Sequence, residues 1–450
     1  APGAPARSEP SAQLALGRAR ERRLKGRRLL DALAIVVRGL GGVIQFAVIL
    51  FLGRQFGAEV VGYYGLGVAI TVFSGTLVSL GLPGYLTHLN SVHFAKGDHA
   101  TFRANIRFAV GVTLRVGLAA QLVVGVFGWI AWDWLAANNI GARIVIAAPT
   151  LGTLMGIVLI TTYGLRARNK ALVANALDRP FLHVTTLGLF VLVFAGVQSY
   201  DLRVLGAVAI GTATTMILSW RMVFRGLEAP SRESRRDTFS RVLVGSYFAS
   251  IVVDIILART PILLGSFFFT AGELGSFQVA FSFAASVIVL QEALGGVIGP
   301  RFAVLGAEHA TAPAVRLHHK SQALLFLMVA PLLFVLYRYP EPIVALIGDE
   351  FGDAAIALSI LVVGTAVRCA AGVYRSIFEA TGSIKFGLYT GAVAITVLAI
   401  GIVVYSDEGA VGLAKAWTGA TIVHAVLGYV LCEYVLRRWI QSPAANTEPA

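Results

Sequence analysis

A chain of 450 residues in which 57% of the side chains are hydrophobic and only 14% are charged is too apolar for a soluble globular protein. Its mean hydropathy of +0.76 predicts a polytopic membrane protein. The net charge of +13 does not indicate nucleic-acid binding, because the 37 Lys and Arg residues fall mostly in short segments between apolar runs.

The first 29 residues are rich in Pro, Ala and Arg, and we expect them to form a basic cytoplasmic tail. The first apolar run extends from about Leu29 to Gly53, which is longer than the apolar region of a signal peptide. No small-residue cleavage site follows it. We therefore expect this run to remain as a membrane helix.

Twelve apolar runs are long enough to cross a bilayer as helices. The predicted spans are 32–53, 60–82, 108–132, 144–165, 180–197, 203–224, 242–265, 273–299, 321–338, 353–374, 386–405 and 410–436. The longest loop between them, Arg221–Arg241, divides them into two sets of six. The predicted domains are a six-helix lobe at 30–225, a cytoplasmic linker at 226–240, a second six-helix lobe at 241–436 and a cytoplasmic tail at 437–450.

The distribution of basic residues sets the orientation of these spans. With the N-terminus inside, the outer loops hold only Arg54, Arg143, Arg203 and Arg338, and the inner segments hold most of the others. This bias predicts that both ends of the chain are cytoplasmic.

A weak internal repeat supports two lobes of equal topology. The end of span one into span two, Leu52–Ile70, resembles the end of span seven into span eight, Leu264–Phe283. Six is an even number, so both lobes enter the membrane in the same direction and the repeat is parallel. Two unrelated glycine-rich hairpins would also look alike.

Span seven departs from ordinary membrane sequence. It places Asp254, Arg259 and Pro261 deep in an apolar run, where charged groups cost free energy that lipid does not return. Proline cannot donate to the carbonyl four positions back, so we expect a kink between Asp254 and Pro261. The polar backbone left there needs protein or water, so the span is expected to border a water-filled cavity.

Thiols and imidazoles give no sign of a metal site. Cys369 and Cys432 both fall in apolar segments and fit neither a disulfide framework nor a metal-ligand spacing. The histidines, including the adjacent pair His318 and His319, also lack such a spacing. We therefore predict no metal, no cofactor and no catalytic residues.

The region after span one resembles a known family. The pattern GRQFGAEVVGYYGLGVAITVFSGTLVSLGLPGYL is similar to the opening helices of bacterial polysaccharide and O-antigen flippases, a branch of the multidrug/oligosaccharidyl-lipid/polysaccharide (MOP) exporter superfamily. The residues that carry this resemblance are Arg54, Gly57, Gly62, Tyr64 and Ser79–Leu82, and, in the second half, Ile343–Ala354 and Glu379–Ala394. The match covers roughly residues 30–436 and has low specificity per residue.

The resemblance implies a V-shaped, all-α membrane transporter with twelve helices in two parallel lobes around a central cavity. It implies a bacterial cytoplasmic-membrane protein that moves polyprenyl-diphosphate-linked oligosaccharides from the inner to the outer leaflet. Its partners would be that substrate, membrane lipids, and a polysaccharide polymerase or other assembly proteins.

Diphosphates crossing a membrane need cationic groups, and arginine suits them because its planar fork engages two oxygens. Arg38 in span one and Arg259 in span seven occupy the first helix of each lobe, at about 9 Å and about 25 Å from the inner ends of their helices. Gln45 shares a helical face with Arg38. We predict Arg38, Arg259, Gln45 and, from the resemblance, Arg54 as substrate-binding residues. Snorkelling to the inner interface is the alternative for Arg38.

Intramembrane acids are candidates for coupling and gating. Asp254 extends a polar stripe with Tyr247 and Ser250, and Glu292 in span eight raises the same question. Each acid either makes an interhelical hydrogen bond or links H+ or Na+ binding to movement of the lobes. We predict Asp254, Glu292 and Pro261 as coupling or gating residues.

Three other functions compete with the flippase. The first is a multidrug/cation antiporter of the same superfamily. The second is a membrane glycosyltransferase such as a polymerase or ligase, which needs a larger outer loop than the roughly fifteen residues of Arg338–Gly352. The third is a scaffold that transports nothing. We expect a transporter rather than an enzyme.

Overall fold

The structure is a computed structural model that describes residues 10–133, 142–227, 239–307, 311–381 and 383–441. Within these ranges nearly all residues are helical and no strand is formed. We call residues 10–227 the N-terminal half and residues 239–441 the C-terminal half.

The N-terminal half contains α-helices and two short π-helical turns, which carry the symbol η. They are α1 (Pro10–Val78), α2 (Leu82–Ala95), α3 (His99–Ile130), α5 (Ala142–Ala167), α6 (Ala171–Ala176), η1 (Leu177–Phe181), α7 (Leu182–Gly188), η2 (Leu189–Val193) and α8 (Tyr200–Phe224).

The C-terminal half contains α-helices and two short 3-10 turns. They are α9 (Arg241–Gly265), α10 (Ala271–Ala307), α11 (Thr311–Arg338), α12 (Pro340–Ala345), η3 (Asp349–Phe351), α13 (Gly352–Ala370), α14 (Tyr374–Ala380), α15 (Ile384–Val404), η4 (Ser406–Glu408) and α16 (Gly409–Gln441).

Every one of the twelve predicted spans falls on helix. Among the described residues, nine helices are long and apolar enough to cross a membrane, and α1 holds the first two predicted spans. Spans five and seven fall on the segment from α6 to η2 and on α9. The prediction of an all-α polytopic membrane protein is therefore confirmed.

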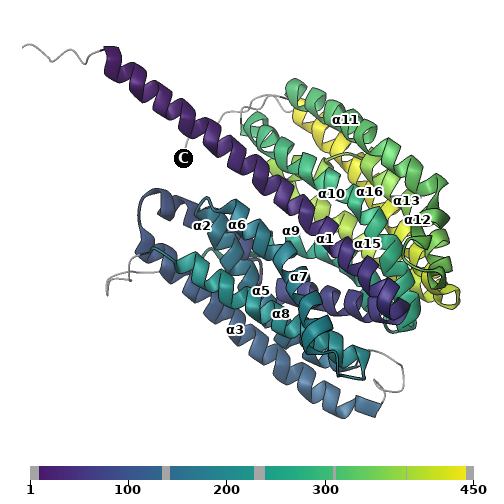
Figure 1. Cartoon of the computed structure of the whole chain (residues 1–450). Coiled ribbons are helices and arrows are strands. Elements are labelled where there is room, and N and C mark those ends of the chain that lie inside the picture. The colour runs from purple at the N-terminus through teal and green to yellow at the C-terminus, as the bar shows by residue number, and fades with distance from the viewer. Residues whose placement is uncertain (1–9, 134–141, 228–238, 308–310, 382, 442–450) are drawn as a thin grey trace, which may run out of the picture.

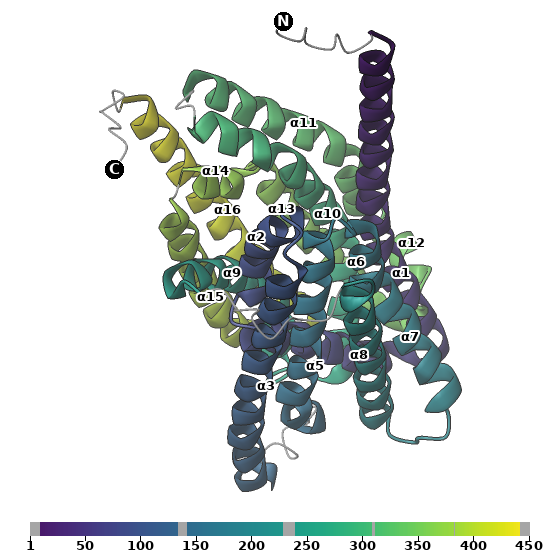
Figure 2. The ribbon, with the colours of Figure 1, turned by 90° about the vertical axis from the view of Figure 1, so that its left-hand side faces the viewer.

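Glycine sets the bend between the first two spans. Gly57 has φ 87° and ψ −179°, a conformation that residues with a Cβ rarely adopt, and α1 changes direction there. We call this end of the molecule the bend end. The beginning of α1 and the end of α16 both lie at the opposite end, on opposite sides of the molecule, and we call this end the termini end (Figure 2).

A second break interrupts span two. α1 ends at Val78 and α2 begins at Leu82, and between them Leu80 and Gly81 have φ values of 50° and 74°. Pro83 follows in the first turn of α2, where its missing N–H costs no hydrogen bond. The Ser-Leu-Gly-Leu motif of the sequence is therefore a turn between two helices.

The two halves share their largest hydrophobic core toward the bend end. Figure 1 shows the helices that contribute to it. That core joins Leu66 and Phe190 of the N-terminal half to Phe277 and Trp417 of the C-terminal half. Two further cores lie toward the termini end, one in each half, and Phe239 and Val244 of the C-terminal half also pack against the N-terminal one. One comprises α2, α3, α5, α6 and the end of α8, and the other comprises the ends of α10, α13 and α16 with α14. The halves therefore share one large core toward the bend end, whereas toward the termini end they meet where α9 begins.

One further contact joins the halves along α2 and the start of α9. The ring of Tyr85 lies 6.4 Å from that of Tyr247, and a Cβ on Gly81 would lie 2.5 Å from the backbone nitrogen of Phe248. Gly81 therefore serves both the turn and the close approach of α9.

One predicted boundary differs from the structure, and another cannot be compared with it. α1 begins at Pro10, so helix extends through most of the segment predicted as a tail, because Arg, Glu, Leu and Lys are good helix formers. Most of the predicted linker at 226–240 lies outside the described residues.

Candidate functional site

At the bend end, α1 and the start of α10 cross with their backbones in contact. A Cβ on Gly62 would lie 1.8 Å from the carbonyl oxygen of Ala271, and a Cβ on Gly275 would lie 1.9 Å from that of Ala58. The same offset along the chain separates Ala58 from Ala271 and Gly62 from Gly275. The contact is thus reciprocal, as a parallel repeat requires, and only glycine fits either position.

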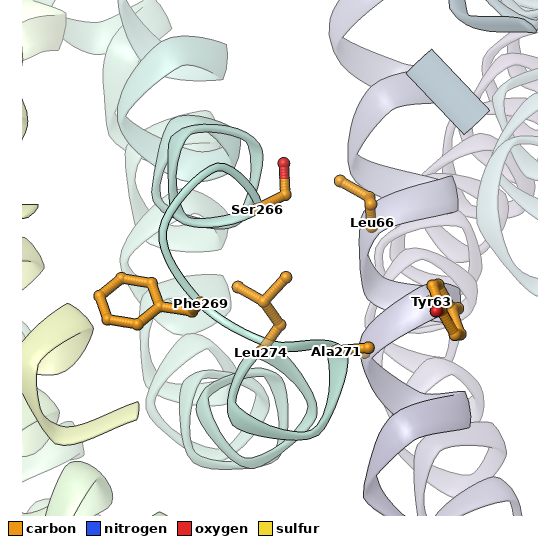
Figure 3. A pocket seen from close by; sticks show the side chains of 7 residues that line it. Tyr63, Leu66, Ser266, Phe269, Ala271 and Leu274 are labelled. Carbon is orange, nitrogen blue, oxygen red and sulfur yellow. The ribbon is translucent and has the colours of Figure 1, made fainter. Parts of the chain in front are cut away.

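Little space remains beside this crossing. A pocket of about 10 Å³, room for about one water molecule, lies between Tyr63 and Leu66 of α1 and Ser266 and Leu274 of the C-terminal half (Figure 3). Figure 3 also shows Ala271 next to α1. The two halves are therefore closed against each other here.

Arg54 adds a polar contact at the surface of the same end. Its Nε donates a hydrogen bond to the carbonyl oxygen of Leu346 at 2.6 Å, although the side chain is exposed. Nearby, a Cβ on Gly53 would lie 2.6 Å from the Ile347 side chain. The Arg-x-x-Gly turn thus docks on the loop before α13, and Arg54 joins the two halves. Its predicted role in substrate binding stays a prediction.

A buried polar pair lies in the N-terminal half, beginning two residues beyond Gly62 on α1. The Tyr64 hydroxyl of α1 and Nδ1 of His183 on α7 are 2.7 Å apart, and both side chains are at least nine-tenths buried. Tyr64 is seven residues beyond Gly57, which places it about 10 Å from the bend. Such a pair satisfies two groups that would be costly to bury alone.

Arg259 of α9 brings a permanent charge to this pair. It lies close enough to Tyr64 for its charge to act on the hydroxyl, and its side chain is half-buried. Tyr64 and Arg259 belong to different halves, and their helices α1 and α9 pack against each other. The structure therefore places the guanidinium of Arg259 at the interface between the halves. Thr260 and Pro261, which follow it, are buried, and α9 remains helical through Pro261.

Comparisons with known proteins come from structure alone. The sequence matches no family model, and no curated protein matches it. Three solved structures are similar over most of their length. The first is an inward-facing multidrug resistance MATE family transporter of the MOP superfamily, with a TM-score of 0.65, 13% identity and coverage of 91% of this chain and 100% of that chain. The second is the lipid II flippase MurJ in an inward closed conformation, with a TM-score of 0.64, 12% identity and coverage of 90% of this chain and 87% of that chain. The third is a MOP superfamily transporter from Pyrococcus furiosus, with a TM-score of 0.60, 12% identity and coverage of 92% of this chain and 95% of that chain.

The chain has the MOP transporter fold. Its neighbours with this fold are transporters, and they include both a multidrug transporter and a lipid flippase. An outward-facing MATE transporter gives a TM-score of 0.60, below the 0.65 of the inward-facing one.

Within this MOP fold, the predicted residues fall into two groups. Arg259, Arg54, Gln45 and Pro261 have described side chains, whereas those of Arg38, Asp254 and Glu292 lie outside the described part of the structure. Gln45 is half-buried on α1, one residue before Phe46, whose ring packs 4.6 Å from that of Phe283 on α10. Gln45 therefore lies where α1 meets the C-terminal half.

Sequence reasoning missed the partners of these residues. His183 gave a signal, since a histidine inside an apolar run is unusual, but its contact with Tyr64 joins residues far apart in sequence. Arg368, which sequence position alone suggests would snorkel, instead donates from Nε to Oε1 of Gln291 at 3.1 Å. Gln291 in turn donates to the Gly372 carbonyl oxygen at 2.9 Å. This second polar group joins α10 to α13 inside the C-terminal half.

Proposed function

We propose that the protein is a flippase that translocates polyprenyl-diphosphate-linked oligosaccharide repeat units from the inner to the outer leaflet by alternating access. The observation that carries this proposal is the position of Arg259 on α9, a helix of one half that packs against α1 of the other, where its charge acts on Tyr64. A guanidinium stays charged when partly desolvated, so the interface keeps a cation within the membrane.

The charge favours an anionic cargo. A diphosphate carries oxygens that an arginine fork can bind in pairs, and the Coulomb attraction is stronger where water is scarce. The lipid tail of the proposed cargo would remain in the bilayer while the headgroup passes between the halves.

Alternating access requires two packings of the halves, and the cores support this. One core is shared at the bend end, and each of the two cores at the termini end belongs mainly to one half, so rocking would exchange one set of contacts for another. We propose that the bend end is the outer side and that both termini are cytoplasmic, in the bacterial cytoplasmic membrane. Asp254 and Glu292 remain candidates for H+ or Na+ coupling, and Arg38 and Gln45 for an earlier substrate station.

A multidrug/cation antiporter is the second candidate, because an inward-facing multidrug transporter shares the fold over 91% of this chain. Drug efflux on expression would favour it. The membrane glycosyltransferase is disfavoured, since the structural neighbours are transporters.

The test combines gene deletion with complementation. We expect the deletion strain to accumulate lipid-linked repeat units on the inner leaflet and to lose surface polysaccharide, as read by mass spectrometry of the lipid extract. The wild-type chain should restore export, Arg259→Ala should fail at equal expression, and Arg259→Lys should restore it in part.

Arg115→Ala is the matched control. Arg115 is also an arginine inside a predicted span, but its side chain is exposed on α3. Normal export with Arg259→Ala, or equal losses with Arg259→Ala and Arg115→Ala, would contradict the proposed role of Arg259. An unchanged pool of lipid-linked glycans in the deletion strain would contradict the function.

A further inference from the structure

Three side chains with metal-ligating atoms meet at the termini end of the C-terminal half. They are the adjacent His318 and His319 of α11 and Glu433 of α16, and one ligand atom from each lies within 4.8 Å of the others. α11 and α16 pack against each other (Figure 1). The adjacent histidines alone gave no metal-ligand spacing in the sequence. The third ligand, the carboxylate of Glu433, comes from another helix.

The distances suit a single small cation. Oε1 of Glu433 is 3.8 Å from Nε2 of His318 and 3.9 Å from Nε2 of His319. Two ligands of a tetrahedral zinc ion, with bonds of about 2.0–2.1 Å, lie about 3.4 Å apart. Small side-chain rotations would therefore bring the three atoms onto one ion.

Burial shows that these atoms are not ordinary surface groups. The His318 side chain is 0% exposed, and both of its ring nitrogens are buried without a hydrogen-bond partner in the described structure. Oε1 of Glu433 is also buried without a hydrogen-bond partner in the described structure, although the Glu433 side chain as a whole is 24% exposed. Leaving such groups unsatisfied is costly, and a bound cation would satisfy them.

The site is both held in place and accessible. The His318 ring stacks near Tyr429, one turn before Glu433 on α16, at a centroid distance of 6.4 Å. His319 is 50% exposed, so water and ions can reach the cluster from its side.

We propose that His318, His319 and Glu433 bind one divalent transition-metal ion of the zinc class, with water as a further ligand. Two imidazoles and one carboxylate are a set that zinc accepts, whereas calcium and magnesium prefer oxygen ligands alone. The ion would tie α11 to α16 and so stiffen the C-terminal half at its termini end. This inference is independent of the cargo that the protein carries.

The test measures zinc binding to the purified full-length chain, in lipid nanodiscs and without an affinity tag. Competition with a fluorescent zinc chelator should give one saturable site per chain. Cobalt at the same site should give the visible absorption of a tetrahedral nitrogen and oxygen complex. Zinc should also raise the midpoint of thermal unfolding.

The variants are His319→Ala and Glu433→Gln, with His93→Ala as control. Changes to residues that only support metal ligands cost about 10–100-fold in affinity, so loss of a direct ligand should cost at least about tenfold. His93 lies at the same end of the molecule, beside Asp98 at 3.1 Å, and its loss should leave binding unchanged.

Wild-type protein without saturable zinc binding would overturn the proposal. So would zinc affinity in either ligand variant equal to that of wild type. Because Glu433→Gln preserves shape, its unfolding midpoint without zinc reports whether it is folded, and zinc should no longer raise that midpoint.

Discussion

Gly62 and Gly275 occupy equivalent places in the two halves, and each lies against the backbone of the helix that carries the other. Ideal Cβ atoms at these positions would be 1.8 Å and 1.9 Å from the carbonyl oxygens of Ala271 and Ala58. Contacts this short are possible only without side chains, so the closed bend end depends on the two glycines.

We expect Gly62→Val to hold the bend end open. Overpacking of about 1–3 kcal/mol shifts the balance between closed and open states by about fivefold or more. A cysteine introduced at Ser266, which is 4% exposed, should then react at least about fivefold faster with a water-soluble maleimide.

Gly111→Val is the control for this experiment, because a Cβ there would meet no atom within 4 Å. The native Cys369 and Cys432 are fully buried and should contribute little labelling. Equal labelling of Ser266→Cys with and without the Gly62 substitution would show that this crossing does not govern access.

Arg54→Ala should have a small effect. The bond from Nε of Arg54 to the Leu346 carbonyl is exposed to water, so its loss should cost about 1 kcal/mol and change flipping by no more than about fivefold. Flipping of a fluorescent lipid-linked oligosaccharide in proteoliposomes measures this. A loss as complete as that expected for Arg259→Ala would instead place Arg54 among the substrate ligands.

Tyr64→Phe should destabilise the N-terminal half by about 1–3 kcal/mol, because Nδ1 of His183 would stay buried without its partner. The double variant Tyr64→Phe with His183→Leu should lose less than the sum of the single losses, since both polar groups are then absent. Chemical unfolding in detergent gives the three values. Tyr337→Phe, at a 57% exposed site, is the control and should change stability by less than about 0.5 kcal/mol. Additive losses would show that the two side chains are not coupled.

Asp98 should make the start of α3 sensitive to acid. Its carboxylate caps the helix by accepting a hydrogen bond from the Thr101 backbone N–H at 3.0 Å, and this bond, with a smaller effect of His93, lowers the pKa of Asp98 below its ordinary value of 3.8. The stabilisation is therefore present above that ordinary value and is lost as pH falls through the lowered pKa.

At neutral pH, Asp98→Ala should weaken the first turn of α3 by about 1 kcal/mol, a modest amount because the carboxylate is 41% exposed. Hydrogen exchange of the α3 amides should show this difference at pH 7 and a smaller one near pH 3. A difference that does not change with pH would mean that the charged form of Asp98 has no part in the cap.

The membrane spans could be predicted from sequence because twenty consecutive apolar residues are a strong local signal. The fifth span was the least accurate. It was predicted to begin at residue 180, whereas the chain is already helical from Ala171 and accommodates Pro180 in the π-helical turn η1. A π-helical turn does not change the hydropathy of the sequence, so hydropathy does not predict it.

The site was predictable only in part. Arg259 was identifiable because a charge in an apolar run is costly. The contact of Tyr64 with His183, and the approach of Glu433 to His318, depend on how helices far apart in sequence pack. A single sequence contains no record of such packing, so the cluster of His318, His319 and Glu433 could not be predicted.

The two π-helical turns on either side of α7 also determine the direction in which the side chains after them point. A π turn holds about one residue more than an α turn, which rotates everything after it by roughly 100° about the helix axis. His183 is the second residue after η1, so the direction of its imidazole depends on that extra residue. A chain shortened by one residue within Leu177–Phe181 would keep nearly the same hydrophobicity and yet turn this ring toward a different neighbour.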